Sequence, residues 1–202
     1  MDVSSLNLNH IEHALTGDRS GSSDFDLNPS ARPAGDWTLR PASVLVPLTQ
    51  RGSELNMVLT RRTMGLRHHP GQVSFPGGKQ EHDDQSPMDT ALRETEEEIG
   101  LAREKVEILG RFDGHETVTG FMVTPFVGIV HGDFKPVPDR SEVESVFEVP
   151  LSFVLNPSNL QMRERMWKGQ LRPYYVIPYG PWYIWGATAR IIKSLGDRVY
   201  GR

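Results

Sequence analysis

The stretch that decides the fold is SPMDTALRETEEEIG, which occupies residues 86–100. Ser86 is a favoured helix N-cap, Pro87 suits the first helical position, and Asp89 is an acidic residue three after the cap. Gly100 is the residue type that most often ends a helix. The stretch therefore predicts one short helix with both of its ends encoded locally.

This predicted helix has two chemically different faces. Apolar and small residues recur at three- and four-residue spacing and predict a buried stripe, which consists of Met88, Ala91, Leu92, Thr95 and Ile99. Glu94, Glu97 and Glu98 fall at i, i+3 and i+4 on another face, so three carboxylates share one patch. Like charges repel at this spacing, and the helix dipole disfavours anions near the C-terminus. We therefore expect a cation to compensate them.

A solvated acidic face is the structural alternative for a helix rich in glutamate. Such faces usually carry interspersed lysine or arginine, whereas here only Arg93 lies among Glu94, Glu96, Glu97 and Glu98. Hard divalent cations such as Mg²⁺ bind clustered carboxylate oxygens, waters and substrate phosphates without any thiolate. The pattern therefore favours a metal site on this helix.

The sequence immediately before the helix has the opposite charge. Residues 55–80 contain no acid but carry Arg61, Arg62, Arg67 and Lys79, whereas residues 81–98 contain eight acids against a single arginine. Cationic side chains beside a carboxylate-held metal suit the binding of a phosphate ester. A Phe-Pro-Gly-Gly turn at residues 75–78 separates the two segments, and its glycines allow a close approach of the backbone to a ligand.

The rest of the chain predicts an α/β fold of a single main domain. Residues 42–48, 57–60, 106–110, 121–130, 143–149 and 174–179 are strand-like, and a turn at residues 50–53 joins the first two into a strand pair. Residues 10–15 and 185–195 predict helices, and residues 156–170 predict mixed helix and loop. The order is not a regular βαβ repeat, so we expect a mixed sheet flanked by helices on both sides.

The N-terminal arm has a different composition from the rest. Residues 17–37 are rich in Gly, Ser, Asp, Pro and Asn, and predict a flexible linker after the short helix. The domain division expected is thus an arm over residues 1–36 and a catalytic domain over residues 37–202. Deleting the chain through Asp26 is accordingly expected to leave turnover almost unchanged.

Composition excludes several classes of function. The 202-residue chain has a net charge of −4, which gives no reason to expect nucleic acid as a partner, and no run approaches the ~20 apolar residues of a membrane span. It has no cysteine, which excludes disulfides and thiolate metal sites and fits a cytoplasmic enzyme.

Adjacent His68 and His69 would point apart on a strand, so phosphate contact or loop structure is favoured over zinc. The sequence leaves a homodimer open.

Two motifs resemble the Nudix hydrolase family. Gly78, a spacer and then RETEEEIGL at residues 93–101 resemble the Nudix box, which has the form G, five residues, E, seven residues, REUxEExGU. Thr95 replaces a bulky residue, and the spacer is one residue longer, which places Asp84 where the first glutamate is expected. The coenzyme A diphosphatase branch has this longer spacer. It also has a second signature, LLTxR[SA]x₃Rx₃Gx₃FPGG, and residues 58–78 match it in register, with only Val58 and Thr63 deviating.

The resemblance implies an α/β/α sandwich and a Mg²⁺- or Mn²⁺-dependent diphosphatase. The implied reaction is hydrolysis of coenzyme A to 3′,5′-ADP and 4′-phosphopantetheine. Carried over to this sequence, the metal ligands are Glu94, Glu97 and Glu98, and Arg93 orients a glutamate.

Further residues are candidates for substrate binding, for support of the loop and for the general base. Arg62, Arg67, Gly77 and Gly78 are the candidate substrate-binding residues. Asp84 supports the loop or an additional metal, and the general base is either a glutamate of the box or Glu142. Two alternatives remain, namely a Nudix hydrolase of another diphosphate such as ADP-ribose or NADH, and a nucleotide sensor without catalysis.

Overall fold

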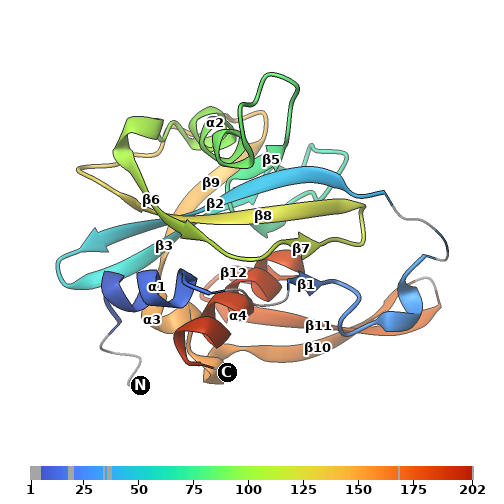
Figure 1. Ribbon diagram of the computed structural model, residues 1–202. Helices are drawn as coiled ribbons and strands as arrows, with labels where there is room; N and C mark the ends of the chain where they lie inside the picture. The colour runs from blue at the N-terminus through green and yellow to red at the C-terminus, as the bar shows by residue number, and fades with distance from the viewer. Residues whose placement is uncertain (1–5, 18–20, 34, 36–37, 168, 202) are drawn as a thin grey trace.

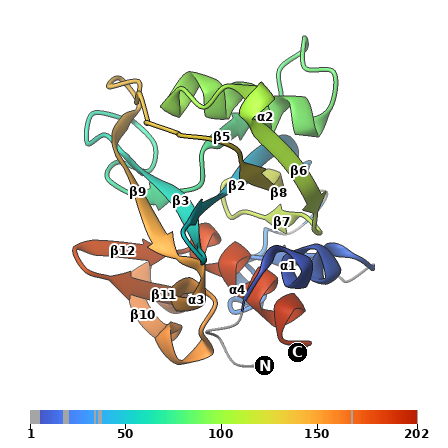
Figure 2. The same ribbon diagram turned by 90° about the vertical axis from the view of Figure 1, so that its left-hand side faces the viewer.

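A large mixed sheet lies between helices on both of its faces, as Figures 1 and 2 show. The computed structural model describes residues 6–17, 21–33, 35, 38–167 and 169–201. Helix α2 (Pro87–Ile99) covers one face of the sheet. The other face is covered by α1 (Leu8–Leu15), α3 (Leu151–Val154) and α4 (Ala187–Val199). The predicted fold class, a mixed sheet with flanking helices, is therefore confirmed.

The centre of the sheet consists of long strands that the sequence predicted. Strand β2 (Arg40–Arg51) pairs in parallel with β8 (Phe121–Val130) and forms an antiparallel hairpin with β3 (Glu54–Arg62). Strand β9 (Val143–Pro150) extends the sheet beyond β3, and β6 (Val106–Arg111) pairs with β8. Four short strands complete it, namely β1 (Ser22–Ser23), β4 (Val73–Ser74), β5 (Gly77–Lys79) and β7 (His115–Glu116).

Helix α2 is built as its sequence predicts at both ends. The Ser86 side chain accepts a hydrogen bond from the Asp89 N–H at 3.1 Å, and Gly100 adopts the left-handed conformation with φ of 68°. The face toward the sheet consists of Thr90, Ala91, Thr95, Glu98 and Ile99. Met88 was expected in this stripe, but it is 40% exposed, because Thr90 takes the buried position in the first turn.

The sheet separates two apolar layers. The smaller layer lies under α2 and includes Leu45, Val58 and Ile99. The larger layer lies on the other face and joins Leu48 and Leu59 of the sheet to Ile192 of α4. Because both faces of the central strands are buried, these strands read as almost continuous apolar runs rather than as alternating patterns.

The region after β9 differs from its prediction. Residues 156–170 were expected to be mixed helix and loop, but after a short 3₁₀ turn (Pro157–Asn159) they form strand β10 (Gln161–Trp167). This strand pairs with β11 (Gln170–Tyr179), which pairs with β12 (Trp182–Trp185), so the predicted helix at 185–195 begins only at Ala187. The sequence of β10 contains good helix formers, and its pairing with β11 overrides their local preference.

The N-terminal arm also differs from its prediction. Residues 18–20, 34, 36 and 37, and with them the predicted domain boundary, lie outside the described residues. Residues 21–33, however, are packed rather than a free linker. Strand β1 pairs with β7, Phe25 is 3% exposed, and the Ser23 hydroxyl donates to Glu116 at 2.8 Å. The packing depends on one aromatic ring and on polar side chains with partners far away in the sequence, which composition alone does not reveal.

This packing changes the expectation for truncation. In helix α1, Ile11 is fully buried in the larger apolar layer. Removing the chain through Asp26 would expose the surface that Ile11 and Phe25 cover. We therefore expect this deletion to destabilise the domain, in contrast to the nearly silent effect that the composition suggested.

A point variant isolates the contribution of the arm. Phe25→Ala should lower the free energy of unfolding by about 3–5 kcal/mol, the usual cost of truncating a buried phenylalanine. The measurement is urea denaturation, with Leu171→Ala as the control because Leu171 is 56% exposed. Equal losses in the two variants would show that residue 25 contributes no core packing.

No helix in the described part of the chain is long and apolar enough to cross a membrane.

Candidate active site

Arg93 is held by a buried carboxylate just before the helix. Its Nε and Nη2 donate to the two oxygens of Asp84 at 2.8 and 3.0 Å, so the pair is bidentate. Asp84 also accepts from the Glu81 N–H and the Thr90 hydroxyl, and only 3% of its side chain is exposed. The hydrogen bonds from Arg93 hold the pKa of Asp84 far below its usual range. Asp84 thus anchors the preceding loop to the helix.

The remaining nitrogen of Arg93 faces the catalytic candidates. Its Nη1 donates to Glu94 at 3.2 Å and to Glu97 at 3.0 Å. Asp84 fixes the guanidinium, and the guanidinium in turn fixes two glutamates. These contacts support the orienting role expected for Arg93.

Glu98 is the most buried of the three glutamates, with 5% of its side chain exposed. Its Oε2 accepts from the Gly77 N–H at 3.2 Å, and its Oε1 accepts from Arg62 Nη1 at 3.4 Å. Burial, opposed only in part by Arg62, raises the pKa of the Glu98 carboxyl to about 8. The carboxyl thus joins α2 to the ends of β3 and β5.

Glu94 lies directly against the glycine turn. A Cβ at Gly78 would stand 2.5 Å from the Glu94 carboxylate, so the glycine is required for this approach. Burial raises the pKa of Glu94 as well, although Arg93 opposes the shift. Glu97 differs from both, since 60% of its side chain is exposed.

The three glutamates do not share one patch in the way that their spacing predicted. Glu94 and Glu97 meet at Arg93, whereas Glu98 faces the sheet and Arg62. Within the described ranges, no three acidic or histidine side chains stand close enough together to hold a metal ion. Helical spacing places residues on a face, but it does not show which arginine each carboxylate meets. The donor set nevertheless fits a hard divalent cation, because it consists of carboxylate oxygens and two of the carboxyls are desolvated.

Arg62 and Arg67, both predicted to bind substrate, have different surroundings. Arg62 lies between Glu98 and Glu142, and its Nη2 is 3.6 Å from the Glu142 carboxylate. Arg67 is exposed in the loop between β3 and β4, residues 63–72, and pairs with no carboxylate in the described part of the chain. The structure therefore brings Glu142, the alternative general base, close to the helix, and leaves Arg67 facing solvent.

The 63–72 loop is closed at its base by backbone hydrogen bonds. The Arg62 N–H donates to Gln72 O at 2.9 Å, and the Thr63 N–H donates to Glu142 O at 2.9 Å. Within the loop, the His69 ring bonds the Gln72 side chain at 2.9 Å, and His69 has a positive φ of 56°. His68 is exposed. These contacts agree with the loop-structure interpretation of the two histidines.

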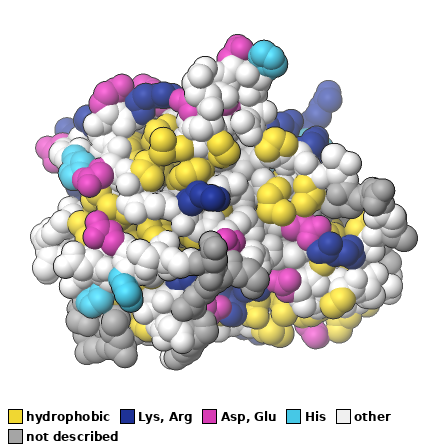
Figure 3. All heavy atoms as spheres, in the orientation of Figure 1, with side chains coloured by type: hydrophobic (Ala, Val, Ile, Leu, Met, Phe, Trp, Pro, Cys, Tyr) yellow, Lys and Arg dark blue, Asp and Glu magenta, His cyan; other side chains and the backbone are white. Residues whose placement is uncertain are grey.

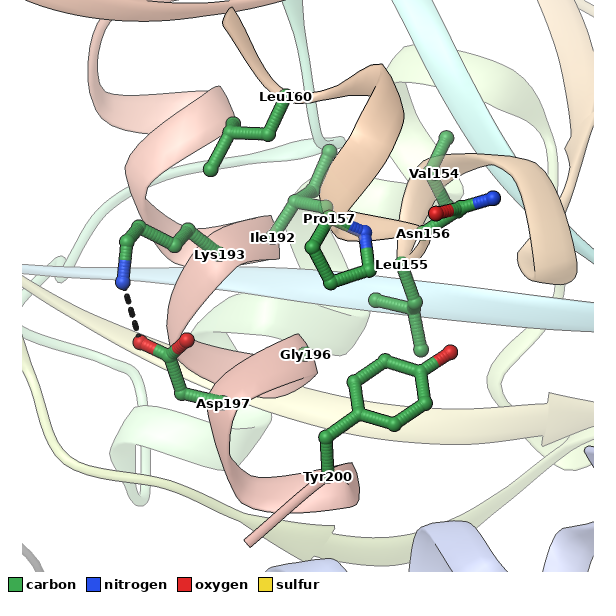
Figure 4. A pocket seen from close by; sticks show the side chains of 10 residues that line it. All are labelled: Val154, Leu155, Asn156, Pro157, Leu160, Ile192, Lys193, Gly196, Asp197 and Tyr200. Carbon is green, nitrogen blue, oxygen red and sulfur yellow. Dashed lines mark hydrogen bonds and ion pairs between the residues drawn. The ribbon is translucent and has the colours of Figure 1, made fainter. Parts of the chain in front are cut away.

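The cavity drawn in Figure 4 lies away from these residues. It is enclosed by α3, the 3₁₀ turn and α4, among side chains that include Leu160, Lys193 and Tyr200. Its volume of about 30 Å³ is room for little more than one water molecule. This cavity is therefore too small to hold a phosphate substrate. In Figure 3 acidic side chains stand along the upper edge of the molecule, over α2 and the loop before it.

Carboxylates desolvated between arginines, at the junction of a helix and a mixed sheet, are oxygen donors suited to a divalent cation that binds a phosphate anhydride. The comparisons then show the family. Residues 39–170 match the family model described as the NUDIX domain, and the chain belongs to this family of diphosphatases. Nudix hydrolases bind nucleotide diphosphate substrates and generally use a divalent metal.

Sequence relatives support the same assignment. The chain is 40% identical over 160 residues to a protein of Enterobacter sp. (strain 638) described as "Uncharacterized Nudix hydrolase NudL". The aligned segment covers 79% of this chain and 83% of the relative. A protein of Yersinia pestis (strain Pestoides F) with the same description is 40% identical over 162 residues, or 80% of this chain and 81% of the relative.

A solved structure supports the fold. The crystal structure of a MutT/nudix family protein from Enterococcus faecalis is similar with a TM-score of 0.53, at 16% identity, over 86% of this chain and 67% of that one.

The raised pKa of Glu98 predicts how the stability of the metal-free protein depends on pH. Its folded value of about 8 lies above its ordinary value of 4.5, so folding favours the protonated carboxyl. The stabilisation is fully present below the ordinary value and is lost as pH rises through about 8. With EDTA present, the Tm measured by differential scanning fluorimetry should therefore fall between these two pH values. Glu98→Gln should flatten this fall, and an unchanged profile in the variant would contradict the burial assigned to Glu98.

The contact between Gly78 and Glu94 predicts a separate effect on activity. Gly78→Ala should fold, because a methyl group there meets only the end of a flexible side chain, but it should displace the Glu94 carboxylate. Activity should fall about 10–100-fold, as is usual when a metal ligand is misaligned. The measurement is steady-state hydrolysis together with a Tm.

Two other variants serve as a comparison and as a control for Gly78→Ala. Glu94→Gln should reproduce the loss of activity with a stable fold. Gly65→Ala is the matched control, since a Cβ there meets nothing within 4 Å. Wild-type turnover in Gly78→Ala would show that the position of the Glu94 carboxylate is unimportant.

Proposed function

We propose that this Nudix hydrolase cleaves the diphosphate bond of coenzyme A, or of its derivatives, in the cytoplasm, and releases 3′,5′-ADP and 4′-phosphopantetheine. The observation that carries the proposal is the second signature, which matches the coenzyme A diphosphatase branch in register over residues 58–78. The longer spacer before Arg93 is a second feature of the same branch.

The position of this signature supports the proposal. Residues 58–78 form the end of β3, the 63–72 loop, β4 and the start of β5. The segment contacts Glu98 twice, through Arg62 near its beginning and through the Gly77 N–H near its end. The part of the sequence that is specific to the branch therefore lies directly against a carboxylate of the general Nudix box.

The chemistry assigned to the chain follows from these contacts. Glu94, Glu97 and Glu98 would hold Mg²⁺ or Mn²⁺, which when bound supplies positive charge to the diphosphate and acidifies a water molecule. Arg93, held by Asp84, keeps Glu94 and Glu97 in place. A glutamate of the box or Glu142 takes the proton as the water oxygen bonds to phosphorus and the bridging P–O bond breaks.

In this proposal, metal binding displaces arginine side chains from the glutamates. Arg62 now neutralises Glu98 and Glu142 in part, and Arg93 does so for Glu94 and Glu97. A divalent cation would compete with these guanidinium groups for the same oxygens. The raised pKa values of Glu94 and Glu98 indicate that the arginines alone compensate the burial incompletely.

The two alternative functions involve the same Nudix box but differ in the substrate or in the absence of catalysis. A hydrolase of ADP-ribose or NADH would need the box but not the second signature. A nucleotide sensor would be expected to lack carboxylates of the box, and all three are present. Both alternatives are weaker for these reasons.

A substrate panel tests the proposed reaction. Coenzyme A, ADP-ribose, NADH and a dinucleoside polyphosphate are each incubated with the enzyme and Mg²⁺ or Mn²⁺, and the products are identified by mass spectrometry. The proposal requires the highest kcat/KM on a coenzyme A species, with 3′,5′-ADP among the products. A higher kcat/KM on ADP-ribose or NADH would establish the alternative instead.

The exposed Arg67 predicts recognition of the 3′-phosphate. Arg62 has carboxylate partners, so Arg67 is the better placed of the two for a substrate phosphate. Coenzyme A should have a kcat/KM about tenfold higher than dephospho-coenzyme A, from one charge-assisted contact. Arg67→Ala should narrow this gap chiefly by lowering activity on coenzyme A, and Arg67→Lys should restore it only in part because lysine lacks the planar fork.

The control for Arg67 is Arg111→Ala, since Arg111 is an exposed arginine of β6 on another part of the sheet. Equal kinetics of the unmutated enzyme on the two substrates would refute the 3′-phosphate assignment and favour the alternative substrates.

A further inference from the structure

The small sheet of β10, β11 and β12 has one face that is rich in arginine and aromatic residues. In antiparallel pairs, directly opposed residues share a face, and successive residues alternate between faces. Arg163 is opposite Tyr174, Arg165 is opposite Arg172, and Trp185 is opposite Val176. Tyr183, two residues before Trp185, lies on the same side. We call this set the arginine–aromatic face: Arg163, Arg165, Tyr174, Tyr183 and Trp185.

The members of this face contact one another. The Arg165 guanidinium lies over the Trp185 ring at 4.6 Å from its centre, and the Tyr174 ring meets Trp185 edge-on at 5.6 Å. The hydroxyls of Tyr174 and Tyr183 are 3.1 Å apart. The side chains therefore form one continuous patch rather than scattered surface residues.

The arginine–aromatic face points away from the core. The opposite face of the same sheet carries Ile177 and Ile184, which are fully buried, and Tyr175, which lies near Lys193 of α4. The members of the arginine–aromatic face belong to neither apolar layer, and Tyr183 is 45% exposed. On this side Val176, opposite Trp185, is fully buried, whereas Arg163, Arg165 and Tyr183 are exposed.

The charge of this face is one-sided. Among the described residues of the three strands the one acid is Glu164, which is opposite Pro173 and so lies on the other face. Arg163 donates to the Gln161 amide oxygen at 2.8 Å, and Arg165 lies against a ring. An aromatic surface bordered by guanidinium groups fits a flat base that carries phosphate.

A chain of hydrogen bonds leads from the residues just after β12 to the candidate active site. The Thr188 hydroxyl, three residues after Trp185, donates to Val73 O in β4 at 3.0 Å. Gln72, the residue before Val73, accepts from the Arg62 N–H, and the Arg62 side chain contacts Glu98. In Figure 2 β12 lies below the loop between β3 and β4, on the same side of the molecule.

We propose that the arginine–aromatic face binds the adenosine portion of the substrate. The adenine stacks on the Trp185–Arg165 surface, while the diphosphate reaches the glutamates of α2. In this binding mode a 3′-phosphate on the ribose would meet Arg67, which is exposed in the loop between β3 and β4. The inference rests on the proposed function only in requiring an adenylated substrate, a property that coenzyme A, ADP-ribose and NADH share.

A binding experiment tests this without hydrolysis. The metal-free protein is titrated with 3′,5′-ADP, with 5′-AMP and with 5′-UMP while tryptophan fluorescence is recorded. We expect saturable quenching by the two adenine nucleotides, and most of it should vanish in Trp185→Phe, which leaves the other three of the four tryptophans in place. Arg165→Ala should weaken the binding about tenfold, the usual effect of losing one stacking partner of a base.

A control variant separates the two faces of the hairpin. Met166→Ala changes an exposed residue opposite Leu171, on the other face of the same strand, and should bind nucleotides like the unmutated protein. Circular dichroism of each variant checks that the small sheet is intact. Equal quenching by 5′-UMP, or no loss in Trp185→Phe and Arg165→Ala, would overturn the assignment. Quenching that depends on protein concentration alone, together with a larger particle in light scattering, would assign the face to a second copy of the chain and also overturn it.

Kinetics distinguish failure of this inference from failure of the proposed reaction. In Arg165→Ala, KM for the best adenylated substrate should rise about tenfold with kcat nearly unchanged, because the contact is distant from the reacting phosphorus. If coenzyme A is not hydrolysed but adenine nucleotides bind through Trp185, the proposed reaction fails and the adenosine site stands. If coenzyme A is hydrolysed with an unchanged KM in Arg165→Ala, the adenosine site fails and the reaction stands.

Discussion

The burial of Glu98 is the constraint on which the arrangement of this site depends. A carboxylate with 5% of its side chain exposed must find partners, and Glu98 finds them in the Gly77 N–H and in Arg62. These contacts join α2 to β3 and β5 from a buried position, whereas a surface pair such as Arg51 with Glu148, where Arg51 is half exposed, is largely solvated.

This constraint also sets the electrostatics of the helix. Its glutamates stand near the C-terminal end, where the helix dipole and mutual repulsion both oppose them. Two arginines offset this cost from opposite sides. Arg93 belongs to the helix and is immobilised by Asp84, whereas Arg62 reaches in from β3. The protein thus keeps a set of oxygen ligands in place by means of charges that a metal could later replace.

The sequence predicted what is encoded locally and missed what depends on distant partners. Both ends of α2 and the long central strands follow from caps, turns and apolar runs, because those signals act over a few residues. The burial of Thr90 in place of Met88 could not be predicted, because it depends on a hydrogen bond to Asp84 across a loop. Strand β10 was missed because a helix-forming composition gave way to pairing with β11.

The same division holds for the candidate site. The residues of the box were identified by their spacing, but their separation into an Arg93 group and an Arg62 group requires the sheet. Arg62 was expected to bind substrate, and its contacts with Glu98 and Glu142 could be found only by folding β3 against α2. The packing of residues 21–33 was hidden for a similar reason, since Ser22 and Ser23 find their partners His115 and Glu116 more than ninety residues later.

The 63–72 loop gives the site its asymmetry. Arg62, the residue just before the loop, and Gln72, its last residue, are joined by a backbone hydrogen bond, so both ends of the loop are held at one point. On one side of that point lies Glu98. On the other lies β4, where Val73 O accepts a hydrogen bond from the Thr188 hydroxyl at the start of α4. In the proposed binding mode, a ligand that contacts the loop would meet carboxylates in one direction and the arginine–aromatic face in the other. A substrate with a diphosphate at one end and a base at the other would contact both places, whereas inorganic diphosphate would contact only the carboxylates.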